Sequence, residues 1–233
     1  MAALPIMSAF TVLATYPAQL PCNYRLQISL SDSFTFYNVA GFLTVVIIVC
    51  AVAFALSRLA LKRYKVTHAG LPGNAVLNPV PLTAVSLILG MGLGGFFDGI
   101  VFHQILQWHS MLSNRVPQTS PSAAAVNMFW DGLFHFIMLL IVGMGSAMML
   151  KLNSRNDINF SLRLFGGGLL SGWGFFNLVE GIINHHLFKL HNVKESTPQP
   201  GLYNAGFILA SIALILIGGY LLKTTGAKQS GPL

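Results

Sequence analysis

Long apolar stretches alternate along the chain with short segments rich in proline and glycine. Each stretch holds the roughly 20 residues that a helix needs to cross a bilayer core of about 30 Å. The connecting segments include AGLPG, VPQTSPS and STPQPG, which are typical of turns. The sequence therefore predicts an all-α, polytopic integral membrane helix bundle of about five transmembrane helices, at Phe36–Leu61, Pro81–Trp108, Ala124–Leu150, Ser161–Leu190 and Leu202–Leu222.

The same pattern divides the chain into three parts. Residues 1–35 form an N-terminal segment, residues 36–222 the transmembrane bundle, and residues 223–233 a C-terminal tail. The N-terminal segment is apolar, but prolines interrupt it and it lacks the basic start of a signal peptide. We interpret it as a segment at the outer face of the membrane, with a sixth helix as the alternative.

Composition identifies the solvent of this chain as lipid. Of the 233 residues, 54% are hydrophobic and only 8% are charged, against about a quarter charged in soluble domains. The net charge of +7 comes from basic residues at the ends of apolar stretches, so it is a topology signal and does not indicate nucleic-acid binding. The expected partners are the lipid bilayer and other membrane subunits or further copies of the chain. Two cysteines are too few for a thiolate metal site.

Basic residues predict the orientation, because lysine and arginine concentrate in cytoplasmic loops. Nine lie at one end of the predicted helices, namely Arg58, Lys62, Arg63, Lys65, Lys151, Arg155, Arg163, Lys223 and Lys228. Four lie at the other end, namely Arg25, Arg115, Lys189 and Lys194. We therefore expect the N-terminus outside and the C-terminus in the cytoplasm.

Three of the six acidic residues, Asp98, Asp131 and Glu180, fall inside predicted helices. A charged group at such a depth costs about 2.5 kcal/mol or more, so it needs a partner and usually marks function. Six histidines accompany them: His103, His109, His135, His185, His186 and His191. At a rise of about 1.5 Å per residue, the three carboxylates lie about 10 to 16 Å below the outer ends of their helices. Three helices therefore bring ligand-type side chains to one layer, with His109, His186 and His191 nearer the outer surface.

An internal repeat relates the second and fourth predicted helices. GMGLGGFFDGIVFHQILQWH, at 90–109, aligns without a gap on GWGFFNLVEGIINHHLFKLH, at 172–191. Both copies have a carboxylate followed by Gly-Ile, then histidines five and eleven residues after the carboxylate. Both run from inside to outside, so the repeat is parallel and predicts a pseudo-two-fold axis along the membrane normal. Glycines at GxxxG spacing, Gly90 with Gly94 and Gly168 with Gly172, predict close helix packing.

Helical geometry decides which of these residues can share a face. Asp131 and His135, four residues apart, lie on one face. A separation of five places carboxylate and histidine about 140° apart on an ideal α-helix. The glycines that follow the carboxylates, Gly99 and Gly181, would permit a wide turn that brings each pair together.

We interpret the cluster as a metal site of one or two ions. Buried ion pairs that only hold helices together, and a proton pathway, are the alternatives. Imidazole and carboxylate ligands without thiolate favour copper or iron, with zinc also suitable. The candidate ligands are Asp98, His103, His109, Asp131, His135, Glu180, His185, His186 and His191. Depth alone predicts that Asp131→Ala loses more metal than His191→Ala.

Two stretches, FFDGIVFHQILQWH and FNLVEGIINHHL, resemble a bacterial family of predicted inner-membrane proteins of unknown function. The likeness extends over most of the region from Pro81 to Leu222 and implies a location in the bacterial inner membrane. Locally, Asp131 and His135 with a neighbouring histidine resemble the aspartate and histidine copper ligands of copper-dependent membrane monooxygenases.

These observations favour a metal-dependent membrane oxidoreductase that acts on a small or lipophilic substrate near the outer leaflet, with zinc-dependent hydrolysis less favoured. A metal-handling or assembly factor for a respiratory or oxygenase complex is the main alternative. An open coordination position that faces a pocket favours the enzyme, and a crowded site favours the assembly factor. A proton-coupled carrier would need a polar path through the cytoplasmic half, where the predicted helices hold no intramembrane charge.

Overall fold

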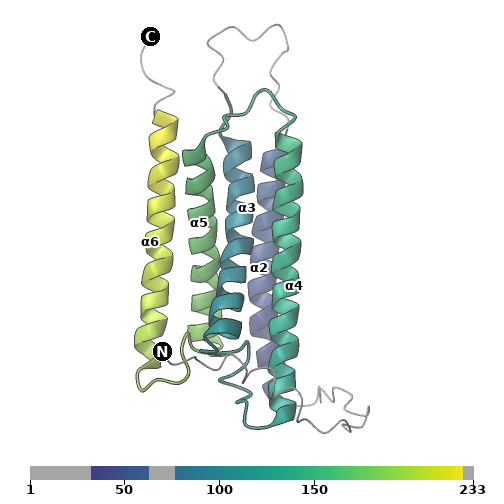
Figure 1. The fold of residues 1–233 in the computed structure, drawn as a ribbon, viewed down its shortest axis with the longest axis vertical. Helices are drawn as coiled ribbons and strands as arrows, with labels where there is room; N and C mark the ends of the chain where they lie inside the picture. Colours follow the sequence, from purple (N-terminus) through teal and green to yellow (C-terminus); the bar gives the residue numbers. More distant parts are fainter. Residues whose placement is uncertain (1–32, 63–76, 228–233) are drawn as a thin grey trace, which may run out of the picture.

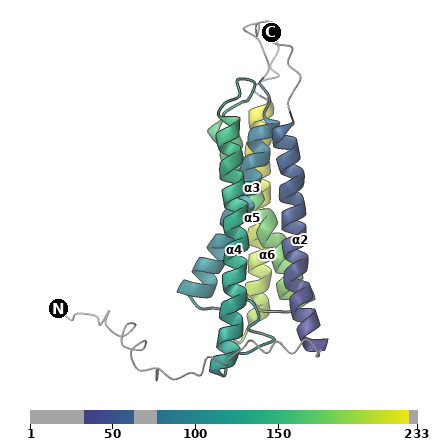
Figure 2. The same ribbon diagram turned by 90° about the vertical axis from the view of Figure 1, so that its right-hand side faces the viewer.

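A computed structural model describes residues 33–62 and 77–227 of the chain. Over these residues the fold is a bundle of helices that run along one common long axis (Figures 1 and 2). The elements are α2 (Ser33–Leu61), α3 (Val80–Phe97) with its extension η1 (Asp98–Ile105), α4 (Pro121–Leu152), α5 (Leu162–Glu180) with its extension η2 (Gly181–Leu187), and α6 (Pro200–Ala227). The predicted all-α fold is confirmed. The alternative of a sixth helix in the N-terminal segment concerns residues before Ser33, which lie outside the described residues.

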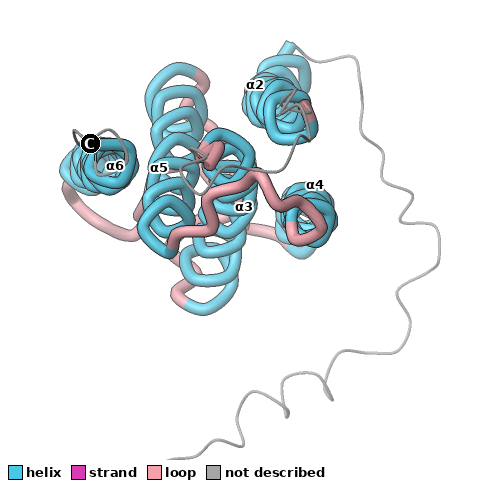
Figure 3. The backbone as a smooth tube through the Cα atoms, turned by 90° about the horizontal axis from the view of Figure 1, so that it is seen from above, coloured by secondary structure: helices cyan, strands magenta, loops and turns pink. Residues whose placement is uncertain are grey.

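Of the five helices in the described part of the chain, four are long and apolar enough to cross a membrane by length and composition. They are Ala40–Leu61, Val80–Ile105, Pro121–Leu152 and Pro200–Thr224. The helix formed by α5 and η2 falls outside this group, because glycines and polar side chains replace much of its apolar surface. It packs between α3 and α6, while α2 and α4 pack on α3 (Figure 3). Neighbouring helices, which cover α5, supply the apolar surroundings that its own sequence lacks.

Helix ends differ from their predicted positions for local reasons. The Ser120 side chain accepts a hydrogen bond from the amide of Ala123 at 3.2 Å, so it caps α4, which begins three residues earlier than predicted. η1 and η2 end before Trp108 and Leu190, because Gln107 and Lys189 adopt φ angles of 50° and 51°. A residue in this left-handed region cannot continue a right-handed helix.

Glycines bring the backbones of α3 and α5 into direct contact. A Cβ atom on Gly90 would collide with the carbonyl oxygen of Leu169, and one on Gly172 with that of Leu87. The offset that aligns the repeat copies takes Gly90 to Gly172 and Leu87 to Leu169. Each contact is therefore the equivalent of the other, as a two-fold relation requires. The structure therefore confirms the parallel repeat and the close packing that the GxxxG spacing predicts.

Substitution of these glycines should destabilise the bundle. Because the colliding atoms belong to backbone, Gly90→Val and Gly172→Val must push the two helices apart, at a cost of about 1–3 kcal/mol or more. A matched control is Gly132→Ala, where a Cβ has no neighbour within 4 Å. Thermal unfolding in detergent, followed by size exclusion, should show a lower transition temperature for both valine variants. Unchanged transitions would contradict the backbone contact.

The two ends of the bundle differ in character. One end, which we call the basic end, carries all the described residues of the larger basic group: Arg58, Lys62, Lys151, Arg155, Arg163 and Lys223. The opposite end, which we call the site end, contains the ends of η1 and η2 and the beginnings of α4 and α6 (Figure 1). The predicted clustering of positive charge at one end thus follows from the topology of the helices.

Candidate metal centre

Each repeat copy changes from α-helix to π-helix at its carboxylate. η1 begins at Asp98, and η2 begins at Gly181, directly after Glu180. A π-helix bonds each residue to the fifth one along, so it brings side chains five apart onto one face. Asp98 Oδ2 accordingly lies 3.2 Å from His103 Nε2, and Glu180 Oε1 lies 3.2 Å from His185 Nε2. The predicted wide turn is confirmed in both copies.

The glycine after each carboxylate lies where a neighbouring helix comes close to the turn. A Cβ on Gly99 would lie 2.5 Å from His135 Nε2, and one on Gly181 would lie 2.9 Å from the Ile208 side chain. Both distances are shorter than real Cβ contacts, so a larger residue would displace the side chain of α4 or α6. The glycines therefore let the neighbouring helices approach the site.

A reversal of the chain supplies a third ligand-type side chain to each copy. After the left-handed residue in each copy, the amide of Trp108 donates to the carbonyl of Phe102, and that of Leu190 to the carbonyl of Asn184. In each copy the chain then reverses direction at the end of the helix, so that the side chains of His109 and His191 lie in the protein interior. His191 Nε2 lies 3.3 Å from Glu180 Oε1. These histidines are 4% and 1% exposed, so they are buried in the site and do not lie at a solvated rim.

Two equivalent groups result, each with one carboxylate and two histidines. Within each group the ligand-type atoms lie within 4.8 Å of one another. The first group is Asp98, His103 and His109, and the second group is Glu180, His185 and His191. All six residues are buried. The spacing of five and eleven that defines the repeat is therefore the spacing of each group.

The groups meet at the pseudo-two-fold axis. The rings of His109 and His191 stack with centroids 4.4 Å apart and planes within 11° of parallel. His103 also lies close to His191, with ring centroids 5.8 Å apart. The six side chains consequently form one cluster that combines both halves of the repeat.

Hydrogen bonds on the outer side of the first group fix the orientation of its two rings. His103 Nδ1 lies 2.9 Å from Asp131 Oδ1, and His109 Nδ1 lies 2.8 Å from the carbonyl oxygen of Val193. Because both partners only accept, each Nδ1 carries the proton. In a neutral ring the lone pair is then on Nε2, which in both residues points to the cluster. Carboxylate or carbonyl partners of this kind are typical of metal-ligating histidines.

The lone pairs that converge in the cluster have too few donors. His109 Nε2, Asp98 Oδ1 and Glu180 Oε2 are buried acceptors that form no hydrogen bond with the described residues. The ring nitrogens of His185 and His191 are also without a well-formed hydrogen bond there, although both Nε2 atoms lie 3.2–3.3 Å from Glu180 Oε1. Buried polar atoms are normally bonded, and such a concentration of acceptors is costly unless a positive charge lies among them. A proton on His103 would satisfy its contact with Asp98, but it would leave His109 Nε2 without a partner.

Burial also keeps the two loop histidines neutral. His109 and His191 follow the ends of the helices, and desolvation holds the pKa of both well below its ordinary value. Nearby imidazoles, above all His191 for His109 and His185 for His191, lower each pKa further. A neutral imidazole is the form that ligates metal.

Asp131 lies beside the first group and outside it. Its Oδ1 receives His103 Nδ1 and also the backbone amide of Met111, at 2.7 Å. The aspartate therefore joins α4, η1 and the following loop, and it orients a histidine of the cluster. Sequence spacing could not distinguish this position from that of a direct ligand.

Two of the candidate histidines are directed elsewhere. His135 Nδ1 bonds to the carbonyl of Asp131 at 2.7 Å, and His186 Nδ1 bonds to the carbonyl of Gly181 at 2.8 Å. Neither belongs to the two groups. Asp131 and His135 share a face of α4, as their spacing predicts, but only Asp131 reaches the cluster.

Asparagines form a part of the site that the sequence analysis did not identify. Asn127 Oδ1 accepts from the amide of Leu112, and Asn204 Oδ1 accepts from the amide of Val193, so α4 and α6 anchor the two ligand-bearing loops in the same way. Asn177 and Asn184 are buried near Glu180 in sequence, and their side-chain oxygens form no hydrogen bond with described residues. The signal in the sequence that could have identified these asparagines is an amide side chain within an otherwise apolar helix.

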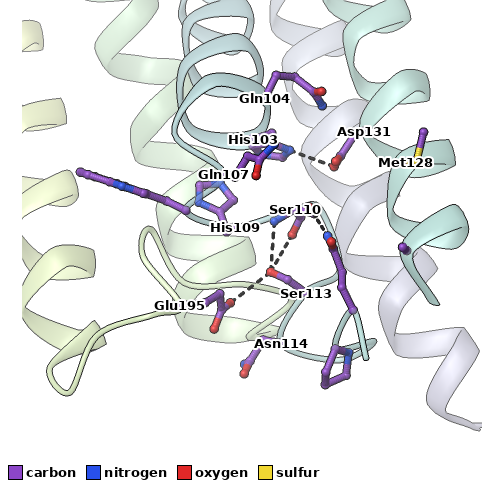
Figure 4. A pocket seen from close by; sticks show the side chains of 14 residues that line it. His103, Gln104, Gln107, His109, Ser110, Ser113, Asn114, Met128, Asp131 and Glu195 are labelled. Carbon is purple, nitrogen blue, oxygen red and sulfur yellow. Dashed lines mark hydrogen bonds and ion pairs between the residues drawn. The ribbon is translucent and has the colours of Figure 1, made fainter. Parts of the chain in front are cut away.

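The surroundings of the two groups differ. Both groups have an aromatic ring beside a histidine, Phe134 by His103 and Phe207 by His185, with ring centroids 6.0 and 5.2 Å apart. Only the first group also has a carboxylate, Asp131, bonded to the outer nitrogen of its histidine. A pocket of about 690 Å³ adjoins the first group only, and His103, His109 and Asp131 are among its lining residues (Figure 4). Its other walls carry mostly amide and hydroxyl side chains, including Gln104, Ser110 and Ser113.

Comparison with known proteins gives one match. Neither the curated proteins nor the solved structures contain a match to this chain. A family described as predicted membrane protein DUF2243 matches residues 85–225, which include both groups and the helices that carry them. This result confirms the resemblance drawn from the motifs of the two repeat copies, and the chain belongs to the DUF2243 family of predicted membrane proteins.

Proposed function

We propose that this membrane protein is a metalloprotein that holds two transition-metal ions, one in each carboxylate–histidine–histidine group. The observation that carries the proposal is the convergence of buried lone pairs without donors, with His109 Nε2 as the clearest case. An ion-pair network among histidines and carboxylates is the competing explanation. It leaves that nitrogen unpartnered, whereas a metal ion in each group would bind one atom of each of its three residues, His109 Nε2 included.

The donor set favours iron. Two histidines and one carboxylate per ion, with open positions, are typical of non-haem Fe(II) oxygenases. Catalytic zinc uses a similar set with a water in the fourth position, and imidazole also suits copper. Iron is therefore expected first, and copper and zinc are the alternatives. Two carboxylates in the groups and Asp131 beside them offset part of the charge of two divalent ions.

We further propose that the protein is an oxidoreductase. Three protein ligands leave coordination positions open, and a pocket leads to the first group. Bound iron would supply redox chemistry at these positions. The chain contributes the buried ligands, the hydrogen bonds that orient His103 and His109, and a cavity in which a substrate can lie beside them. The basic residues at the opposite end support a site on the outer side of the bacterial inner membrane, with the C-terminus in the cytoplasm.

Elemental analysis tests whether the protein binds transition metal. Protein purified in detergent without chelators should contain close to two equivalents of transition metal, with iron dominant. Retention is expected because ligands held in a buried, preformed arrangement bind metal tightly. Less than about a tenth of an equivalent of every transition metal, before and after reconstitution with Fe(II), would contradict the proposal.

A metal-handling role is the second candidate, and the polarity of the pocket supports it. A hydrated ion could enter through walls that carry amides and hydroxyls, with Glu195 at the loop side. This role predicts that bound metal exchanges with an apo acceptor protein and that no substrate is turned over. Oxygen consumption or product formation with retained metal would instead support the enzyme.

A further inference from the structure

The two groups, although equivalent in sequence, differ in their access to water. The pocket is lined by two residues of the first group and by Asp131. No residue of the second group is among its lining residues. Packing does not distinguish the groups, because Phe134 lies against His103 much as Phe207 lies against His185, with ring centroids 6.0 and 5.2 Å apart. The structure therefore has one group that lines this open cavity and one group that does not.

The lining of the pocket defines the molecules that it can accept. Hydrogen-bonding groups predominate, from Gln104, Gln107, Ser110, Ser113, Asn114 and Gln118. Its charged lining residues are acidic, Asp131 and Glu195, and among the described residues no lysine or arginine lines it. Lys194 lies outside the lining, over the ring of Trp108 at 4.9 Å. A negative, polar cavity attracts uncharged or cationic hydrogen-bonding molecules and repels anions.

The loops that form the pocket are fixed to one another, so the cavity is part of the fold. The Ser113 hydroxyl lies 2.9 Å from the Ser110 carbonyl and 3.2 Å from Glu195 Oε1 (Figure 4). Glu195 also accepts the amide of Asn192 at 2.8 Å. The floor thus joins the loop after η1 to the loop after η2.

We propose that this pocket delivers small, water-soluble, uncharged or cationic molecules to the metal of the first group, and that the second group is closed to them. This inference rests on the proposed function, since it assigns different roles to the two metal ions. Of the expected small or lipophilic substrates, it favours a small polar one that enters from the aqueous side. The ion in the first group is the reactive one, and the ion in the second group is held more tightly and exchanges slowly.

Release of metal to a chelator tests the inference. Full-length protein loaded with Fe(II) in nanodiscs is mixed with excess tris(2-aminoethyl)amine, a small, water-soluble chelator that is cationic at neutral pH, and the iron that remains is measured with time. The first equivalent should leave at least about tenfold faster than the second, because only the first group adjoins the pocket. Met128→Trp, at a pocket-lining position of α4, should slow the fast phase several-fold. Ala205→Trp, at an exposed position of α6 that does not line the pocket, should leave both phases unchanged.

Charge variants at Gln104 give a second measurement that does not depend on filling the pocket. Gln104 is exposed and lines the pocket. Because this chelator is a cation, Gln104→Glu should accelerate the fast phase and Gln104→Lys should slow it, with both effects reduced in high salt. Wild-type protein that binds no iron would overturn the proposed function itself. Two bound equivalents released in a single phase, or a fast phase insensitive to both Met128→Trp and the Gln104 charge, would overturn only the inference.

Discussion

Glu180→Gln should reduce the metal content from about two equivalents to about one. Glu180 Oε1 lies 3.2 Å from His185 Nε2 and 3.3 Å from His191 Nε2, and it provides the only negative charge in the second group. Glutamine keeps the shape of the side chain but removes that charge, so the buried imidazoles and the ion lose their counter-charge. Loss of one partner of a buried charged pair costs about 3–5 kcal/mol, which corresponds to a loss of affinity of at least about a hundredfold.

The measurement is metal per protein after dialysis at a fixed free-metal concentration. Asp157→Asn provides the control, because this carboxylate pairs with Arg155 at the basic end, far from the cluster. It should retain both equivalents. Asp98→Asn should lose the other equivalent, and the double variant of Asp98 and Glu180 should bind none. Full metal content in Glu180→Gln would show that the second group is not a metal site.

His191→Ala should lose more metal than Asp131→Ala, which reverses the order that depth alone predicts. His191 is a buried member of the second group and stacks on His109, so its removal deletes a ligand and leaves a cavity beside the other group. Asp131 acts through His103, which it orients from behind. Loss of such an orienting partner typically lowers metal affinity by about 10–100-fold and leaves the ligand set intact.

A conservative variant separates orientation from charge. In Asp131→Asn the amide oxygen of the new side chain can still accept from His103 Nδ1 and the Met111 amide, so this variant should retain more metal than Asp131→Ala. A metal titration followed by the absorption of bound Co(II) would give both affinity and ligand geometry. The assignment of Asp131 to an orienting role fails if Asp131→Asn and Asp131→Ala lose as much metal as His191→Ala.

Much of this architecture could be predicted from the sequence, because hydrophobic runs and the repeat are strong signals. The helices, their approximate ends and the parallel repeat follow from run length and from the alignment of 90–109 with 172–191. The wide turns were predictable since glycine follows a carboxylate in both copies. All six residues of the two groups were among the candidate ligands.

Other features depend on contacts that spacing does not encode. Asp131 has the residue type and depth of a ligand. In the structure its Oδ1 instead accepts hydrogen bonds from His103 Nδ1 and from the backbone amide of Met111. A straight helix would carry His109 and His191 toward the outer surface, which is where the sequence predicts them. The chain instead reverses at Gln107 and Lys189, whose side chains give no sign of a left-handed conformation. The pocket beside the first group is lined largely by the loop after η1, and the spacing of residues within helices does not encode how that loop folds.

The stacked pair of His109 and His191 has a consequence for biosynthesis. During synthesis the first repeat copy enters the membrane while the second is still being made, and at that stage Asp98, His103 and His109 have no second group to pack against. The cluster is completed only after the loop that carries His191 has emerged and α6 has secured it through Asn204. Under the proposed function, acquisition of metal would follow translation of nearly the whole chain, and a truncated product would have the side chains of the first group but no complete cluster.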